Sequence, residues 1–347
     1  MRHNGRTRFG LGAVGLLLTV LCAAPAAGAA QVLKIATVSP DGTMWMLKLR
    51  AGAAAIEKRT QGRVQLKFYP GGVMGSDESV LRKIRIGQLH GGAVMGGSLA
   101  HIYPDLLIYG LPFLFHTLAE VDYVRARMDQ GLIHGLEQRG FVTFGFAGGG
   151  FAYLMSSHPV SNLGELKQRK IWIPQGDVVS QAVLESAGIA PVPLPISDVL
   201  TGLQTGLIET VGASPVGAIA LQWHTKTRHL TDLPFSYLYA LLAVDRAAFM
   251  RLPPEDRKIV SEEMTRVFRE IDEQNRLDDR KATAALRQQG IAFTAVSGEA
   301  VVEIKKVAGV ATEQLRRKGI LTPGLVGTIE RHLHAYRATK QVRAAAE

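Results

Sequence analysis

The sequence predicts an α/β protein with two lobes and a long helix that spans them. Short apolar segments alternate with amphipathic segments of helical period, first over residues 32–147 and again over residues 151–206. Such alternation is typical of α/β domains with a largely parallel sheet. Gly148-Gly149-Gly150 separates the two series. From Pro253-Pro254 a polar–apolar pattern continues without a breaker to Gly290, and a helix of that length, roughly 50 Å at 1.5 Å per residue, exceeds the needs of one small lobe.

In the first series, the helices begin and end at recognisable signals. Gly62 and Gly87 close the first two helices, because glycine accepts the left-handed conformation that often ends a helix. Thr117 and Glu120 form a capping box that starts the third helix. We expect strands at residues 32–38, 64–69, 92–95 and 141–147, and helices at 43–60, 76–86 and 117–139.

The second series repeats the alternation with shorter segments. Ser197 opens its last helix and Gly206 closes it. We expect strands at residues 151–156, 170–173 and 189–193, and helices near 178–187 and 197–206.

These elements divide the chain into two lobes joined by a hinge. Residues 31–150 are expected to form lobe I, completed by about 236–275, and residues 151–235 to form lobe II, completed by about 276–347. The chain crosses between them near Gly148–Gly150 and again around residues 237–244. A ligand that bridges two separately cored lobes is expected to close them about this hinge.

Residues 1–30 have the composition of a secretory signal peptide. Arg2, Arg6 and Arg8 precede an apolar run over residues 11–22, and the small residues 27–30 follow it. The run is shorter than the roughly 20 residues that a membrane span needs. The only cysteine, Cys22, follows Leu21, where a lipid-attachment signal has a small side chain, so cleavage near Ala30 is favoured. The exported chain then carries no disulfide, and it keeps +7 of the formal net charge of +10, because three arginines leave with the leader.

Motifs for catalysis or cofactor binding are incomplete. Gly96–Ala100 resembles a nucleophile elbow, but its second glycine is missing and no histidine or acid can be assigned to Ser98. Gly148–Gly150 leads into a strand pattern, whereas a phosphate site needs a helix N-terminus. Neither close pair of histidines has i, i+4 spacing. We therefore expect no metal, no cofactor and no nucleic-acid partner, and we interpret the scattered basic residues as solvated helix faces.

The most informative stretch lies in the second series. Lys170-Ile171-Trp172-Ile173-Pro174 is followed by Pro191–Asp198 and Leu203–Glu209. This order resembles the solute-binding proteins of tripartite ATP-independent periplasmic (TRAP) transporters, of the DctP type. Further family-like pieces are Leu33–Ala36, Tyr69–Gly72, Gly75–Asp77, Leu111–Phe115 and Leu252–Asp256.

The resemblance implies a fold, a function and partners. The fold is that of a two-lobed periplasmic binding protein, type II-like, with hinge strands and a long lobe-spanning helix. Such a protein captures a small molecule between its lobes and delivers it to the small and large membrane subunits of the permease, which an ion gradient drives. The resemblance also implies a monomer in the periplasm.

The resemblance implies a ligand site in which this chain departs from the usual residues. The strand arginine that usually grips the ligand's carboxylate corresponds to Trp172, a second arginine often falls near Ala152 or Tyr153, and an asparagine falls at about Ala213. Tryptophan offers one N–H and no charge, so we expect a ligand with an apolar or aromatic part and a weaker need for an anion. A carboxylate on such a ligand would be met by backbone N–H groups, by Ser214 or Gln175, or by a nearby lysine or arginine. The candidate ligand-binding residues are Val38, Trp45, Asp77, Phe151, Tyr153, Trp172, Gln175, Ala213, Ser214 and Trp223.

Two other functions remain open at this stage. An exported enzyme of the α/β-hydrolase kind would need a triad or a metal site. A ligand-presenting subunit of a sensor would have the same fold and differ only in its partner. For any single aromatic residue of the candidate site, a place in the hydrophobic core is the simpler interpretation.

Export is expected to remove the leader and to leave a cysteine-free chain that begins near Ala30 or Gln31. N-terminal sequencing of the exported protein measures the cleavage site. An intact Met1, or a lipid on Cys22, would contradict this expectation.

Overall fold

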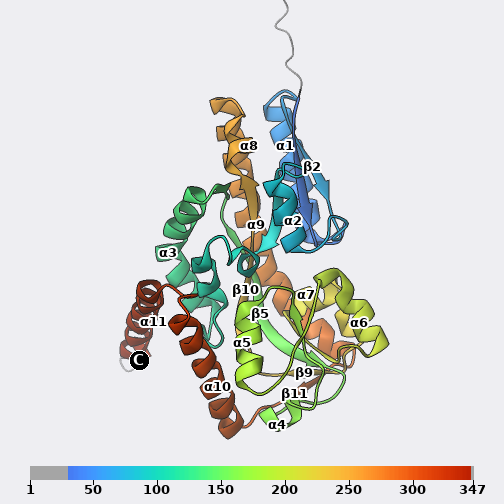
Figure 1. Ribbon diagram of the computed structural model, residues 1–347, viewed down its shortest axis with the longest axis vertical. Helices are drawn as coiled ribbons and strands as arrows, with labels where there is room; N and C mark the ends of the chain where they lie inside the picture. Colours follow the sequence, from blue (N-terminus) through green and yellow to red (C-terminus); the bar gives the residue numbers. More distant parts are fainter. Residues whose placement is uncertain (1–29, 345–347) are drawn as a thin grey trace, which may run out of the picture.

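The computed structural model describes residues 30–344 and consists of two α/β lobes stacked along the long axis of the molecule (Figure 1). The predicted leader lies outside the described residues, apart from Ala30. The two-lobed α/β architecture predicted from the sequence is confirmed. Its main sheet has the strand order β11-β9-β5-β10-β3-β1-β2, with β4 paired to β10 and β8 paired to β5.

The first lobe follows the predicted alternation. In chain order it holds β1 (Gln31–Thr37), α1 (Met44–Arg59), β2 (Val64–Tyr69), α2 (Asp77–Arg85), β3 (Gly91–Met95), the 3-10 helices η1 (Gly96–Leu99) and η2 (Pro104–Gly110), α3 (Leu118–Gln138), β4 (Phe141–Val142) and, later in the chain, α8 (Arg246–Met250). β1 runs parallel to both β2 and β3. Because neighbouring residues of a strand face opposite sides, Ile35 packs in one core with α1 while Ala36 packs in another with α2.

The second lobe is built from shorter strands. It holds α4 (Leu163–Leu166), β6 (Trp172–Pro174), α5 (Val178–Ser186), β7 (Val192–Leu194), η3 (Ile196–Asp198), α6 (Val199–Thr205), β8 (Thr210–Ala213), α7 (Pro215–Ala220), η4 (Trp223–Thr225), β9 (His229–Thr231) and β11 (Ala292–Thr294). β6 and β7 form a separate parallel pair. The strand expected at 189–193 is found later, at Val192–Leu194, because Gly188 and Ile189 still close α5 through hydrogen bonds to Glu185 and Leu184.

Two antiparallel strands connect the lobes. β5 (Phe146–Ser156) pairs with β10 (Ser236–Asp245) in its first half and with β8 and β9 in its second half. The prediction of two separate strands on either side of Gly148–Gly150 is wrong, since β5 continues through the glycines. Gly150 has a φ of +86°, so glycine lets the strand change direction there without ending its pairing. The crossing predicted at these glycines and at residues 237–244 is therefore found in β5 and β10.

The long helix α9 (Pro254–Gln288) spans both lobes, as predicted. It packs on α1 in the first lobe, on β5 at the crossing and on α7 in the second lobe. Its polar side chains at i, i+3 and i+7 face β5. Gly148 donates its N–H to Asp272 Oδ1 at 2.7 Å, and Asn275 Nδ2 donates to the Gly148 carbonyl at 2.6 Å.

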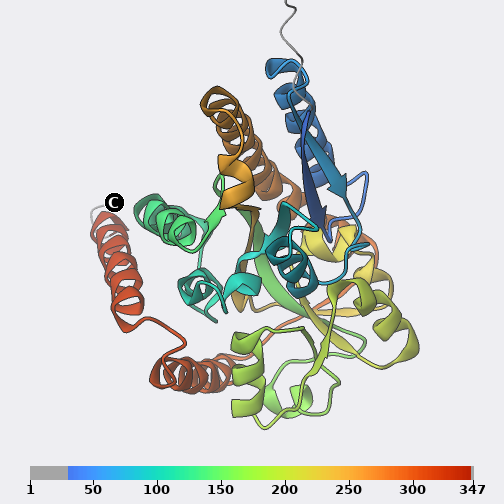
Figure 2. The ribbon, with the colours of Figure 1, turned by 45° about the horizontal axis from the view of Figure 1, so that its top comes forward.

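The C-terminal helices lie on different lobes. α10 (Gly298–Arg317) packs on α5 of the second lobe, whereas α11 (Pro323–Ala344) packs on α3 of the first (Figure 2). Arg337 of α11 pairs with Glu120 of α3 at 2.8 Å. The sequence predicts that residues of about 276–347 complete lobe II, whereas α11 packs on α3 of the first lobe. The exact lobe boundaries stay a prediction.

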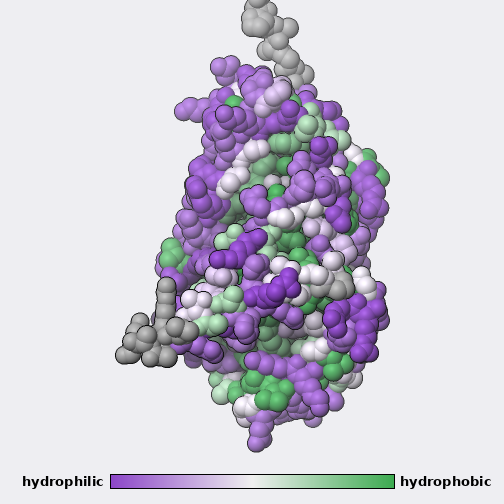
Figure 3. Space-filling view, turned by 90° about the vertical axis from the view of Figure 1, so that its left-hand side faces the viewer, coloured by the Kyte–Doolittle hydropathy of each residue, from purple (hydrophilic) through white to green (hydrophobic). Residues whose placement is uncertain are grey.

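Apolar side chains are gathered mainly in the interior. On the face shown in Figure 3, hydrophilic residues cover most of the surface, and apolar residues show mainly in a central band between them. No helix within residues 30–344 has the length and apolar composition required to cross a membrane.

Asp279, the third polar residue of α9 that faces β5, packs closely against Gly150. A side chain at Gly150 would meet Asp279 Oδ1 at 3.1 Å, and this oxygen is buried without a hydrogen-bond partner among the described residues. Burial raises the pKa of Asp279 to about 6, and the backbone N–H of Val216 opposes that shift. The charged form is therefore disfavoured in the folded state.

Asp279→Asn is expected to stabilise the protein at neutral pH by about 1–2 kcal/mol. A rise of roughly two pKa units corresponds to about 3 kcal/mol, and partial exposure of the carboxyl lowers this figure. Because the folded-state pKa lies above the unfolded value, the penalty is complete above about pH 6 and disappears as the pH falls toward about 4. Urea unfolding of the wild type and of Asp279→Asn at about pH 4.5 and about pH 7.5 measures this difference in the free energy of unfolding.

The control is Glu273→Gln, which removes a charge from an exposed position on the same helix. Its effect is expected to be small at both pH values. If Asp279→Asn raised the free energy of unfolding equally at the two pH values, the buried charge would not be the cause of the stabilisation.

Candidate functional site

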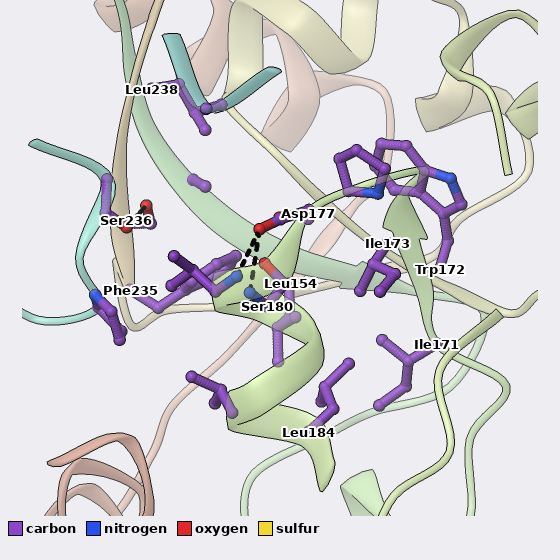
Figure 4. A pocket seen from close by; sticks show the side chains of 18 of the residues that line it. Leu154, Ile171, Trp172, Ile173, Asp177, Ser180, Leu184, Phe235, Ser236 and Leu238 are labelled. Atoms are coloured by element: carbon purple, nitrogen blue, oxygen red, sulfur yellow. Dashed lines mark hydrogen bonds between the residues drawn. The ribbon is translucent and has the colours of Figure 1, made fainter. Parts of the chain in front are cut away.

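A cavity of about 250 Å³ lies between the lobes, slightly below the usual range for ligand pockets, about 300–1,000 Å³. The first lobe contributes residues of η1, η2 and the segment that follows η2, the second lobe contributes β5, β6 and α5, and the crossing strand β10 closes one side. Figure 4 shows this arrangement, with α5 and β6 facing the segment that carries Phe235, Ser236 and Leu238. A single ligand in this cavity would therefore touch both lobes and the strand that joins them.

The part of the cavity inside the second lobe is an apolar chamber. It is formed by Leu154 of β5, Ile171 before β6, Ile173 of β6 and Leu184 of α5, and we call these four residues the apolar chamber. Strand alternation places Ile171 and Ile173 on the side of β6 that faces α5. In Figure 4 both point toward Leu184, while Trp172 projects to the other side.

Trp172 lines the cavity and also belongs to the second-lobe core. Its residue is 5% exposed, its ring packs edge to face on Trp223 with centroids 5.0 Å apart, and its Nε1–H donates to the Leu194 carbonyl at 3.0 Å. The indole N–H is therefore already used inside the protein. Trp172 contributes an apolar surface to the cavity and no free donor.

Polar groups gather where the lobes meet. Asp177 caps α5, since its Oδ1 accepts the N–H groups of Val179 at 3.1 Å and Ser180 at 3.0 Å. Gln175 lines the same region. On the opposite wall, Ser236 Oγ donates to the Gly110 carbonyl at 2.8 Å. Among the described residues that line the cavity, Asp177 is the only acidic side chain, and none is a lysine, arginine or histidine.

Asp77 supports the first-lobe wall from behind. Its Oδ2 accepts the N–H of Met95 at 3.0 Å and the hydroxyl of Ser98 at 2.8 Å, and both residues line the cavity. Burial raises the pKa of Asp77. The elbow-like segment at Gly96–Leu99 forms the 3-10 helix η1, and the Ser98 hydroxyl donates to this acid, an arrangement that does not activate a serine nucleophile.

Of the ten residues predicted for the ligand site, Trp172 and Gln175 line the cavity. Asp77 and Trp223 contact lining residues from behind, and Phe151 packs on Tyr237, which lines it. The structure does not bring the other five to the cavity, and those five are Val38, Trp45, Tyr153, Ala213 and Ser214. The ligand-binding roles of all ten stay predictions.

Local structure explains why four of these five lie elsewhere. Trp45 donates to Asn275 at 3.2 Å and so joins α1 to α9. Ser214 caps α7. Tyr153 and Ala213 are paired across β5 and β8, and alternation along β5 directs Tyr153 away from the cavity that Leu154 faces.

Sequence reasoning missed the apolar chamber and Asp177. The period-2 pattern of residues 151–156 and 170–174 was the available signal, because it separates Leu154, Ile171 and Ile173 from the aromatic residues between them. Asp177 directly precedes the predicted helix at 178–187, which is the usual place of an N-cap.

Comparison with known proteins places this site in context. The sequence model of the family described as "Bacterial extracellular solute-binding protein, family 7" matches residues 35–318. A solute-binding protein of Verminephrobacter eiseniae is 27% identical over 248 residues, which cover 69% of this chain and 72% of the relative. The C4-dicarboxylate-binding periplasmic protein DctP of Rhodobacter capsulatus is 24% identical over 206 residues, 58% of this chain and 61% of the relative.

Solved structures share the fold over nearly their whole length. A TRAP periplasmic solute-binding protein from Desulfovibrio salexigens with bound orotic acid has a TM-score of 0.79 at 16% identity, and covers 88% of this chain and 99% of its own. The sugar acid binding protein from Advenella mimigardefordensis in complex with galactonate has a TM-score of 0.81 at 18% identity, with 88% and 98% covered.

Trp172→Ala is expected to lower the free energy of unfolding by about 3–5 kcal/mol, because it leaves a cavity in the second-lobe core beside Trp223. Trp172→Phe keeps an aromatic ring and is expected to cost less. It loses one hydrogen bond to the Leu194 carbonyl, about 0.5–1.5 kcal/mol, and this carbonyl still accepts the N–H of Gln175 at 3.3 Å. Urea unfolding followed by circular dichroism measures both. A cost below about 1 kcal/mol for the alanine variant would show that Trp172 is not part of the core.

Proposed function

Because the chain belongs to the bacterial extracellular solute-binding proteins of family 7, we propose that it captures a small organic ligand in the interlobe cavity and delivers it to the membrane subunits of a TRAP transporter. The observation that carries this proposal is that both lobes and the crossing strand β10 line one cavity. The predicted leader supports a periplasmic location for the mature protein. The small and large permease subunits are the partners that such a function requires.

Ligand capture is proposed to close the lobes about β5, β10 and α9. A ligand that contacts both lobes binds the closed state better and so shifts the population toward it. The lobes already approach closely at Gly176, which precedes α5. A side chain at this glycine would make the carboxylate end of Glu78 of α2 move aside. The φ of +82° at Gly176 is a second reason for glycine there.

The ligand is proposed to carry a substantial apolar or aromatic part. The named ligands of the relatives, such as C4-dicarboxylates and galactonate, are acids. In this chain Trp172 and the apolar chamber stand at the second-lobe wall instead of a cation. Losing a charge-assisted hydrogen bond costs about 1.5–3 kcal/mol, whereas burying about 100 Å² of apolar ligand surface returns roughly 2.5 kcal/mol.

Mass spectrometry of small molecules that co-purify with the folded protein tests the proposed function directly. A compound released on unfolding, present in stoichiometric amount and with an apolar moiety, is the expected result. A sensor subunit would bind the same compound, so a pull-down with the membrane subunits distinguishes that alternative.

Calorimetric titration with acids of increasing apolar size is expected to show affinity rising with apolar area. Succinate and malate lack apolar surface for the chamber, whereas a ligand that buries about 100 Å² there gains roughly 50-fold in affinity. Val183 lines the cavity, and Val183→Thr keeps the shape of its side chain but replaces a methyl group with a hydroxyl. This variant is expected to lower the affinity for the larger ligands several-fold and to leave the affinity for succinate unchanged.

The proposal of an apolar ligand would be overturned if a four-carbon dicarboxylate bound with micromolar or tighter affinity and no larger apolar compound bound at all. Glu185→Gln, on α5 but away from the cavity, is the control and is expected to change none of these affinities.

A further inference from the structure

The cavity differs from an anion site in the charge of its walls. Asp177 is the only aspartate, glutamate, lysine, arginine or histidine among the described residues that line it. Among the described residues Asp177 forms no ion pair. Its hydrogen bonds engage Oδ1 alone, so Oδ2 is available to a ligand in the cavity.

The helix that would otherwise attract an anion is already capped. The N-terminus of α5 faces the cavity, since Gly176, Asp177, Val179 and Ser180 all line it. Free N–H groups at a helix start favour negative charge. Here the carboxylate of Asp177 takes the N–H groups of Val179 and Ser180 itself. A ligand carboxylate at this point would meet a negative side chain and would find these two donors occupied.

Two acids, Asp77 and Glu78, lie behind the first-lobe wall. Asp77 holds Met95 and Ser98 from behind, with Oδ1 buried and unpartnered among the described residues. Glu78 lies against Gly176. Arg82 is 3.9 Å from Glu78 and is thus directed to that acid.

Two further cations contact residues that line the cavity. Arg125 lies 3.4 Å from the hydroxyl of Tyr237 and is paired with Asp129 and Asp272. Lys305 is exposed on α10, with Nζ 5.8 Å from the ring centroid of Phe113. Neither cation lines the cavity itself, whereas Asp177 does.

We infer that the ligand presents a hydrogen-bond-donating head, an ammonium group in the best-matched case, to Asp177, and places its apolar part in the chamber of Leu154, Ile171, Ile173 and Leu184. This inference rests on the proposed solute-binding function and names the ligand class of the same cavity: an amphiphilic amine rather than an organic acid. A protonated amine supplies the donors that the open oxygen of Asp177 accepts. Its hydrocarbon part replaces water against the four apolar side chains.

Three ligands that share one phenyl group and differ in the head test the inference. They are 2-phenylethylamine, 2-phenylethanol and phenylacetate, titrated calorimetrically at neutral pH into the mature protein. The amine is expected to bind about tenfold tighter than the alcohol, the gain of one charge-assisted hydrogen bond. Phenylacetate is expected to bind most weakly, because its charge repels Asp177.

Asp177→Asn isolates the charge, because asparagine is as good an N-cap as aspartate and preserves the start of α5. This variant is expected to lose about tenfold in affinity for the amine, to bind the alcohol as before and to bind phenylacetate no more weakly than the wild type. Glu185→Gln removes the same charge from α5 outside the cavity and is expected to leave the order of the three ligands unchanged.

The outcomes separate this inference from the proposed function. Tightest binding of phenylacetate, or an Asp177→Asn variant with an unchanged ratio of amine to alcohol affinity, overturns the inference and leaves solute binding intact. Binding of the acids of the size series with no binding of the amine does the same. If no small molecule co-purifies with the folded protein, and neither those acids nor any of the three phenyl ligands binds, the proposed function itself is contradicted.

Discussion

The buried guanidinium of Arg125 joins the three elements on which the two lobes depend. From α3 it reaches Asp272 of α9 at 3.0 Å and the carbonyl of Phe146, at the start of β5, at 2.6 Å. It also pairs with Asp129 one turn along α3 at 3.1 Å. Asp272 in turn accepts the N–H of Gly148, and Arg125 helps to hold the pKa of Asp272 below its usual value despite burial.

This network has a geometric consequence more than an energetic one. Desolvating buried charges costs much of what their attraction returns, so its clearest effect is to fix where β5 starts against α9. The register between β5 and β10 shifts at Gly149, which lies between the partners of Leu238 and Tyr239. Beyond that irregularity, Ala152 and Leu154 face the cavity, and Phe151 and Tyr153 face the other side. A shift of one residue in this second half of β5 would exchange the two sets and bring two aromatic rings to the cavity.

Much of the fold was predictable from local patterns, whereas the site was only partly so. Alternating apolar segments, Gly62, Gly87 and the breaker-free run to Gly290 predicted the elements of the first lobe and α9, because these signals act within a few residues. The position of α11 on α3 depends on long-range contacts such as Arg337 with Glu120, for which no local pattern exists. The continuity of β5 through Gly148–Gly150 was missed for the same reason, since pairing with β10 overrides the weak strand preference of glycine.

Trp172 shows how much a family motif can predict about the role of one residue in this chain. The resemblance predicts a ligand-binding residue at this position, and Trp172 lines the cavity, but the nature of its contact depends on neighbours that the motif does not specify. Trp172 packs edge to face against Trp223 and donates its N–H to the Leu194 carbonyl. Its contribution to a ligand is therefore apolar surface. Asp177, outside the motif as it was interpreted, is the charged group that the cavity offers.

A crystal structure of the mature protein with the ligand that co-purifies with it would show whether the interlobe cavity binds the solute. Ligand density is expected between Ile173 and Leu184 on one side and the segment of Phe235 and Ser236 on the other, with the polar head beside Asp177. Ligand bound outside this cavity, or against the opposite face of β5 at Phe151 and Tyr153, would contradict this expectation.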